Sequence, residues 1–300
     1  MILAQGLQKR FGSVTALDEF SLQVPERSVF ALLGPNGAGK TTALRILLNI
    51  VRAGKGVAEV FGVDSRKLGP AELARIGFVS ESRELPDWMS VRSFFDYCRA
   101  FYPDWQASEL EELTRLFQLP LDRRLRDLSR GMRMKAQLAS VLAYRPRLLI
   151  LDEPFSGLDV LVREQLMECI AERTPESTVL IATHDLSDVE TFATHVAYLA
   201  GGRMQFAEEM DGLSARFREI EAVVPLTAEL PERLPANWLN LSRAAGVVRF
   251  TDAQYEEGRC TADLQESWPG VRAVSVRALS LRSIFLALAQ RQHSEKQPCD

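Results

Sequence analysis

The segment GPNGAGKTT, residues 34–42, concentrates residue types that bind phosphate groups. It follows the apolar run SVFALL, residues 28–33, which is typical of a strand buried on both faces of a parallel sheet. It precedes residues 44–51, in which apolar side chains recur at helical spacing. Because glycines allow inward-facing N–H groups and a helix N-terminus carries positive potential, such a strand–loop–helix arrangement predicts a phosphate cradle.

Four residues of this loop match the GxxxxGK[ST] pattern of nucleoside triphosphate binding, namely Gly34, Gly39, Lys40 and Thr41. In that pattern Lys40 reaches the β- and γ-phosphates, and the Thr41 hydroxyl binds Mg²⁺. The other loop residues that we expect to line the cradle are Pro35, Asn36, Gly37, Ala38 and Thr42. The alternative interpretation of the same residues is a glycine-rich turn that binds no ligand.

Two further apolar runs end in polar residues that could supply the chemistry. RLLILDEP, residues 147–154, ends with the adjacent carboxylates Asp152 and Glu153, and TVLIATHD, residues 178–185, ends with His184 next to an aspartate. The carboxyl ends of parallel strands meet at one edge of a sheet, beside the cradle. We therefore assign Asp152 to the Mg²⁺ site, Glu153 to activation or orientation of a water, and His184 to the γ-phosphate or that water.

A second helix N-terminus with anion-binding character is predicted at LSRGM, residues 128–132. Ser129 is a plausible N-cap, Gly131 allows close approach of another backbone, and an apolar helical face follows. One nucleotide rarely needs two helix ends from distant parts of one chain. The second end is therefore expected to serve the nucleotide of a partner subunit.

The motifs GPNGAGKTT, LSRGM, LLILDEP, SGLD and ATHD occur in the order and approximate spacing of one family. The chain resembles the nucleotide-binding domain of ATP-binding cassette (ABC) transporters, exporter-type, over residues 1–215. The resemblance implies an α/β P-loop NTPase cassette, with a RecA-like core, an N-terminal antiparallel β subdomain and a helical subdomain over about 84–145. It also implies ATP and Mg²⁺ as ligands and ATP hydrolysis, with Glu153, His184 and Lys40 as catalytic residues.

The same resemblance implies how the site is completed. Two copies pack head to tail around two ATP molecules, and the cradle of one faces Ser129 and Gly131 of the other. Asp159 of SGLD matches the loop that links the two sites, and Phe11 matches the aromatic residue that stacks on adenine. The partners implied are a second copy or a paralogous cassette subunit, together with a separate membrane-spanning permease.

Two departures from the family pattern affect the predicted site. Glu81 stands where glutamine commonly contacts Mg²⁺ and the attacking water, so it joins Thr41 and Asp152 as a metal-site candidate. Carboxylate and amide both accept hydrogen bonds, but only the carboxylate adds charge. In LSRGM, Arg130 replaces a glycine of the familiar LSGGQ, and Met132 replaces its glutamine. Arg130 either contacts the partner's nucleotide or is solvated.

Composition limits the other classes of function. The net charge of −4 and pI near 5.6 provide no basic footprint, so we expect no nucleic-acid partner. No run of about 18 apolar residues occurs, so we expect neither a signal peptide nor a spanning helix, and any membrane would be crossed by another chain. The resemblance implies a cytoplasmic protein that is peripheral at the inner face of the cell membrane. Residues 216–290 are expected to form a small C-terminal α+β domain, and residues 291–300 a disordered tail.

The sequence thus predicts the ATP-hydrolysing subunit of an exporter. A soluble cassette ATPase acting on nucleic acid or ribosomes is the alternative. Only 112 residues separate Lys40 from Asp152 (152 − 40), which leaves no room for the long coiled coil of DNA-repair cassettes. A module that binds ATP without hydrolysing it would need a damaged catalytic set, whereas Asp152, Glu153 and His184 are all present.

Overall fold

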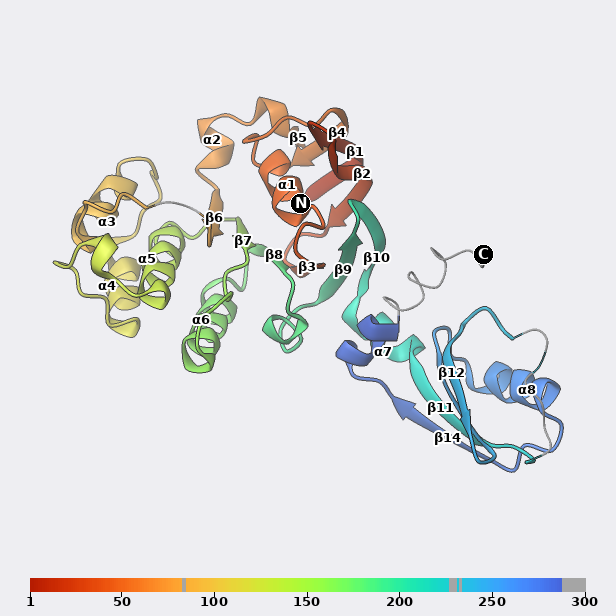
Figure 1. The fold of residues 1–300 in the computed structure, drawn as a ribbon. Coiled ribbons are helices and arrows are strands. Elements are labelled where there is room, and N and C mark those ends of the chain that lie inside the picture. Colours follow the sequence, from red (N-terminus) through yellow and green to blue (C-terminus); the bar gives the residue numbers. More distant parts are fainter. Residues whose placement is uncertain (83–84, 227–230, 232–233, 288–300) are drawn as a thin grey trace. The chain divides into compact units, whose positions relative to one another are not determined.

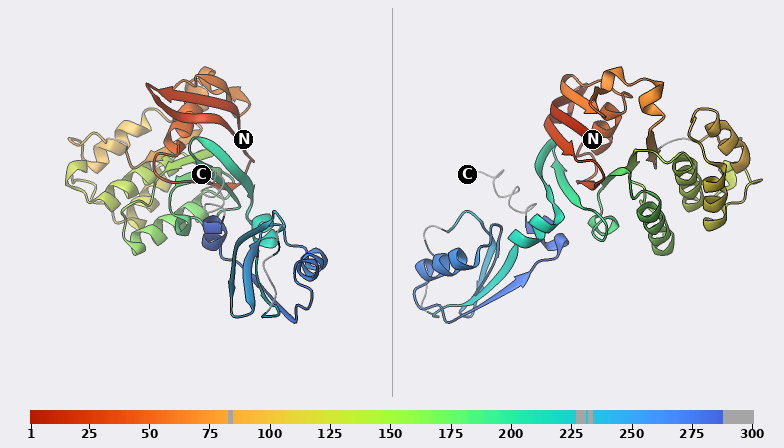
Figure 2. Two further views of the ribbon diagram at one scale, coloured as in Figure 1. Left: turned by 45° about the vertical axis from the view of Figure 1, so that its right-hand side comes forward. Right: turned by 180° about the vertical axis from the view of Figure 1, so that it is seen from behind.

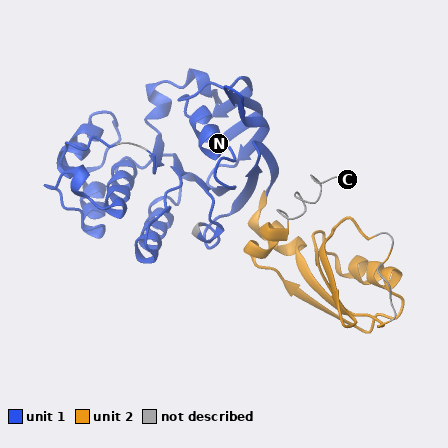
Figure 3. Ribbon diagram, viewed as in Figure 1, with its two compact units in different colours: residues 1–207 blue, residues 208–300 orange. Residues whose placement is uncertain are grey.

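The computed structural model describes residues 1–82, 85–226, 231 and 234–287 (Figure 1). The chain forms two compact units, residues 1–207 and residues 208–300, and each is described by itself (Figure 3). No helix in these described ranges is long and apolar enough to cross a lipid bilayer.

A six-stranded sheet is the centre of the first unit, with strand order β10-β9-β3-β8-β7-β6. Its strands are β3 (Val29–Leu33), β6 (Ile76–Ser80), β7 (Leu148–Asp152), β8 (Thr178–Thr183), β9 (His195–Ala200) and β10 (Arg203–Glu209). The β6, β7, β8, β3 and β9 strands pair in parallel. Every residue of β7 and β8 is buried, which explains why both read as continuous apolar runs.

A second, antiparallel sheet of the first unit has strand order β2-β1-β4-β5. Its strands are β1 (Ile2–Phe11), β2 (Val14–Val24), β4 (Lys55–Val60) and β5 (Val63–Asp64). Buried residues of β1, β2 and β4 belong to one apolar cluster with those of α1 and β3. This sheet and the parallel sheet confirm the α/β class with an antiparallel β part near the N-terminus.

Helices follow the parallel strands and carry the predicted motifs. They are α1 (Lys40–Leu47), η1 (Ser65–Lys67), α2 (Pro70–Leu73), α3 (Val91–Arg99), α4 (Ala107–Leu116), η2 (Leu125–Asp127), α5 (Arg130–Leu142), α6 (Val160–Arg173) and η3 (Leu186–Asp188). The α3, α4 and α5 helices gather beside the edge strand β6 (Figures 1 and 2). They lie within the range predicted for a helical subdomain, so the chain leaves the sheet after β6 and returns at β7.

The α1 helix is shorter than the apolar spacing up to residue 51 predicts. Asn49 adopts a left-handed conformation with φ of 57°. The Asn49 N–H donates to the Ile46 carbonyl at 3.1 Å, and the Ile50 N–H donates to the Arg45 carbonyl at 2.9 Å. This is the hydrogen-bond pattern that ends a helix, and asparagine tolerates the conformation it needs.

The second unit contains a four-stranded antiparallel sheet of order β12-β13-β11-β14, together with helices. Its elements are α7 (Met210–Arg216), β11 (Arg218–Val223), β12 (Trp238–Ala244), β13 (Val247–Asp252), α8 (Glu257–Ser267) and β14 (Ala273–Ala278). Its core stacks Trp238 on Phe250 and on Trp268, with ring centroids 4.1 and 5.7 Å apart. Residues 281–287 are helical. The tail predicted at 291–300 lies outside the described residues.

The cysteines differ in burial, and we therefore expect them to differ in reactivity. Burial raises the pKa of the Cys169 thiol in α6 and of the Cys260 thiol in α8 to about 12, while Cys98 in α3 is partly exposed. Because the thiolate is the nucleophile, we expect iodoacetamide at pH 8 to modify Cys169 and Cys260 at least about 100-fold more slowly than Cys98. Peptide mapping by mass spectrometry measures this difference.

The control for this prediction is the same labelling in guanidinium chloride, which should modify all these cysteines. The raised thiol pKa values also determine how the stability of the fold depends on pH. Both thiol pKa values are raised in the folded state, so the stabilisation by proton retention is complete below about pH 8.5 and is lost as the pH rises toward 12. Equal labelling of Cys169 and Cys98 in the native protein would contradict the packing of α6.

Candidate active site

The loop that the sequence predicts to cradle phosphate lies between the end of β3 and the start of α1. Gly39 precedes α1 with φ of 108°, and a Cβ there would lie 2.3 Å from the Ala16 carbonyl oxygen, so only glycine fits. The first N–H groups of α1 have no intrahelical partner because of helix geometry. These N–H groups give the start of α1 a positive potential beside the loop formed by residues 34–39.

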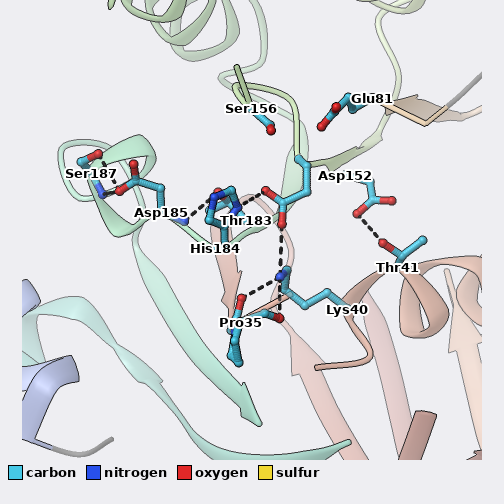
Figure 4. A network of polar contacts seen from close by, with 12 residues as sticks. Pro35, Lys40, Thr41, Glu81, Asp152, Ser156, Thr183, His184, Asp185 and Ser187 are labelled. Carbon is cyan, nitrogen blue, oxygen red and sulfur yellow. Dashed lines mark hydrogen bonds and ion pairs between the residues drawn. The ribbon is translucent and has the colours of Figure 1, made fainter. Parts of the chain in front are cut away.

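A chain of polar contacts crosses the carboxyl edge of the parallel sheet (Figure 4). The buried Lys40 Nζ lies 3.1 Å from Glu153 Oε1 and donates hydrogen bonds to the carbonyls of Gly34 at 2.6 Å and Pro35 at 3.3 Å. Glu153 Oε2 lies 2.8 Å from His184 Nδ1. The structure therefore brings together the three side chains that sequence reasoning named as catalytic.

Glu153 has a backbone conformation that few non-glycine residues adopt. Its φ is 50°, which costs on the order of 1–3 kcal/mol. Its N–H donates to the Ala182 carbonyl at 2.8 Å, which joins the residue after β7 to β8. The adjacent carboxylates have different partners, because Glu153 contacts Lys40 and His184. Asp152 points toward Thr41 (Figure 4).

Asp152 is the buried carboxylate at the end of β7. Its Oδ1 accepts a hydrogen bond from Thr41 Oγ1 at 3.0 Å, and its Oδ2 accepts one from Ser80 Oγ at 3.3 Å. Burial raises the pKa of Asp152, while the two hydroxyl donors act in the opposite direction. Thr41 and Asp152 together offer the hard oxygen atoms that Mg²⁺ prefers beside a phosphate cradle, so the residues present fit that ion.

Ser80 is a contact of the site that sequence reasoning missed. It is the last residue of β6, and its Cα is in register with Asp152 on β7. The signal was available, because a polar residue ended the apolar run IGFVS at the same edge as the other strands.

Four other expected nucleotide contacts lie apart from this chain of contacts. Ser129 caps α5 by accepting a hydrogen bond from the Met132 N–H at 3.2 Å, and Asp159 caps α6 in the same way with Val162 at 3.0 Å. Phe11 at the end of β1 is half-exposed, with Lys9 Nζ 4.9 Å from its ring centroid. Among the described residues, no hydrogen bond or ion pair joins Ser129, Gly131 or Asp159 to Lys40, Glu153 or His184.

The two departures from the family pattern contact each other. Arg130 Nη2 pairs with Glu81 Oε1 and lies 3.3 Å from Ser156 Oγ. Sequence reasoning missed this pair and offered two other surroundings for Arg130. Within the described chain, no hydrogen bond joins the Glu81 carboxylate to Thr41 or to the Asp152 side chain.

Comparisons with known proteins decide the family. The family model described as ABC transporter matches residues 17–156. A daunorubicin resistance ATP-binding protein of Streptomyces coeruleorubidus is 32% identical over 305 residues, which cover 96% of this chain and 94% of that protein. This chain belongs to the ABC transporter family. It is an ATP-binding cassette, an ATPase that uses ATP and Mg²⁺.

Two further proteins, one relative and one solved structure, are similar to this chain over about two thirds of its length. A sulfate/thiosulfate import ATP-binding protein of Xanthomonas campestris is 36% identical over 210 residues, 66% of this chain and 61% of that protein. A solved dimeric cassette in a post-hydrolysis state with ADP and Pi has a TM-score of 0.62 and 22% identity, covering 70% of this chain and 99% of that one. This structural likeness confirms the cassette fold predicted from the sequence.

Proposed function

We propose that this chain is the ATP-hydrolysing subunit of an exporter, which dimerises head to tail around two ATP molecules and drives a separate membrane-spanning partner. The subunit itself would be cytoplasmic and peripheral at the inner face of the membrane. One observation carries the hydrolysis part of this proposal: the Lys40–Glu153–His184 chain lies at the sheet edge beside the Thr41–Asp152 pair.

Each side chain of this group has a separate role in the proposed reaction. Glu153 accepts the proton of the attacking water, and His184, 2.8 Å from Glu153, orients the same water or the γ-phosphate. Lys40 exchanges its contact with Glu153 for the β- and γ-phosphates when ATP binds, which releases the carboxylate for the water. Thr41 and Asp152 hold Mg²⁺, with Glu81 following β6 nearby. When bound, that ion neutralises charge on the phosphates.

Dimerisation is proposed from the position of the second helix N-terminus. Ser129 and Gly131 open α5 but make no hydrogen bond to the cradle of their own chain within the described residues. We propose that they bind the γ-phosphate side of the partner's ATP, and that Asp159 links the two sites. The remaining loop residues 35–38 and Thr42 would surround the phosphates, and Phe11 would stack on adenine.

The direction of transport is proposed from the extent of similarity. The match to the daunorubicin resistance protein covers 96% of this chain, so it includes most of the second unit. The match to the sulfate import protein covers 66% of this chain. Because the resistance protein is similar along nearly its whole length, we favour export of a substrate over import.

A groove beside β6 is the proposed docking surface for the membrane-spanning partner. It has a volume of about 950 Å³ and is lined by Pro86, Asp87, Trp88, Met134 and other residues. The Trp88 side chain is 71% exposed, which is unusual for a large apolar ring. An aromatic ring of this kind can anchor a partner because it buries a large area at low entropic cost.

The test is affinity purification of the Glu153→Gln chain with Mg-ATP from detergent-solubilised membranes of its host. We expect a stoichiometric co-purifying chain with several spanning helices, and we expect Trp88→Ala in the same background to reduce its yield by at least about fivefold, since interface anchors are worth 1 kcal/mol or more. Phe101→Ala is the matched control, because Phe101 is an exposed aromatic outside the groove.

The opposite result would also be informative. Recovery only from the soluble fraction, together with ribosomal or nucleic-acid components, would overturn the transporter proposal. Equal yields of the membrane partner with Trp88→Ala and Phe101→Ala would leave the transporter proposal standing and remove the groove from it.

A further inference from the structure

The Arg130 guanidinium contacts two separate segments of the first unit. Arg130 is the first residue of α5, where it follows the N-cap Ser129. Its Nη2 pairs with Glu81 after β6 and lies 3.3 Å from Ser156 Oγ in the loop after β7. The guanidinium also lies over Gly157, where an added Cβ would be 2.5 Å from Arg130 Nη1.

Gly157 leaves the space that this guanidinium occupies. Its φ of 63° is a conformation that favours glycine, and a Cβ at this position would require the guanidinium end of the Arg130 side chain to shift. Gly157 therefore leaves room for the Arg130 guanidinium to lie across the loop after β7 while it reaches Glu81.

The two partners of Arg130 are attached to the two carboxylate residues of the active site. The Glu81 N–H donates to the Asp152 carbonyl at 3.2 Å, and the Ser156 N–H donates to the Glu153 carbonyl at 3.3 Å. Arg130 thus ties the start of α5, with Ser129, to the backbone of both carboxylate residues. A displacement of Arg130 would be transmitted to both.

The carboxylates around Arg130 give its positive charge a second role. Glu81, Asp152 and Glu153 are three carboxylates near a site for a polyanion. Lys40 pairs with Glu153, and Arg130 pairs with Glu81. Without Arg130, Glu81 would add an unpaired negative charge beside the phosphates, which weakens anion binding at short range.

We propose that Glu81 and Arg130 act as one unit, in which Arg130 is a positioning residue for ATP hydrolysis and Glu81 is its counter-charge. This rests on the proposed roles of Asp152 and Glu153. The unit explains both departures from the family pattern together: the glutamate brings a charge to the site, and the arginine neutralises that charge while bracing the loop at Ser156 and Gly157.

A double-mutant cycle tests the proposal on the full-length chain, with kcat and KM for Mg-ATP as readouts. We expect Arg130→Gly to raise KM about tenfold and to lower kcat about tenfold, because Glu81 is left unpaired and the loop is unbraced. We expect Glu81→Gln in the Arg130→Gly background to bring KM back to within about threefold of the wild type. Recovery of KM from about tenfold to within about threefold is a coupling of at least about threefold, or about 0.7 kcal/mol.

Arg130→Lys separates charge from position. Lysine keeps the charge opposite Glu81 but lacks the planar fork that also reaches Ser156. We therefore expect KM close to the wild-type value with kcat still reduced severalfold, a split that a general loss of structure would not produce. This variant also serves if Arg130→Gly does not fold, as judged by circular dichroism.

Arg92→Gly is the matched control. Arg92 also lies in the first turn of a helix, α3, and forms an exposed ion pair with Asp122 at 3.2 Å. It should leave KM and kcat unchanged. Additive effects of Glu81→Gln and Arg130→Gly, with no recovery of KM in the double variant, would overturn the proposal. Hydrolysis that survives Glu153→Gln in the chain with Glu81 and Arg130 intact would instead remove the proposed role of Glu153.

Discussion

Glu153→Gln is expected to lower kcat for ATP hydrolysis by at least about 100-fold while ATP binding persists. Glutamine keeps the size of the side chain but cannot accept the proton of the attacking water, a contribution worth about 10²–10⁴ in rate. Binding should persist because Lys40 retains the Gly34 and Pro35 carbonyls and gains the phosphates. Steady-state phosphate release and equilibrium binding of labelled ATP measure the two quantities separately.

The structure offers a matched control for this substitution. Glu176 forms an exposed ion pair with Arg27 at 3.1 Å and precedes the start of β8, so it lies toward the opposite edge of the sheet. Glu176→Gln should leave kcat within about twofold, since an exposed ion pair contributes little. Unchanged turnover with Glu153→Gln would show that another group accepts the proton.

Asp152→Asn is expected to have opposite effects on activity and on stability. Hydrolysis should fall by at least about 100-fold, because the amide lacks the charge that holds Mg²⁺ beside Thr41. The nucleotide-free chain should nevertheless unfold at a higher temperature than the wild type at pH 7. The reason is that the buried carboxylate carries a desolvation cost, which the amide avoids while still accepting from Thr41.

The pH dependence of this stability difference follows from the direction of the shift. Burial raises the pKa of Asp152 above its unfolded value, so its stabilising contribution is complete below the unfolded pKa of about 3.9 and is lost as the pH rises through the folded pKa. The advantage of Asp152→Asn should therefore be largest at neutral pH and shrink as the pH falls toward 4.

Thermal unfolding monitored between pH 4 and pH 8 measures this difference, and ATPase assays over a range of Mg²⁺ concentrations measure the activity. Asp122→Asn is the control, because Asp122 is exposed and its ion pair with Arg92 lies at the surface. A variant at Asp152 that unfolds below the wild type at pH 7 would contradict the assignment of a desolvation cost to this carboxylate.

Much of the fold was predictable because its strands are buried on both faces. Such strands read as short apolar runs, and β3, β7 and β8 were all visible in the sequence for this reason. The strands and helices of the second unit carry weaker patterns. Neither β12 nor α8 was predicted, since exposed and half-buried residues interrupt their apolar spacing.

The sequence by itself determined the parts of the site that depend on near neighbours in the chain. The cradle is one loop, and Gly39, Lys40 and Thr41 obtain their places from the strand before it and the helix after it. Asp152 and Glu153 end one strand, so their presence at the sheet edge also follows from local pattern.

Only the tertiary structure decided which of these groups face one another. It brought Glu153, whose N–H is bonded to β8, to Lys40 and His184. It placed Ser80 against Asp152 across β6 and β7. It also joined Glu81 to Arg130. The physical reason is that a side chain's partner across a sheet or between a helix and a loop depends on strand order and backbone direction, which no local pattern of residues specifies.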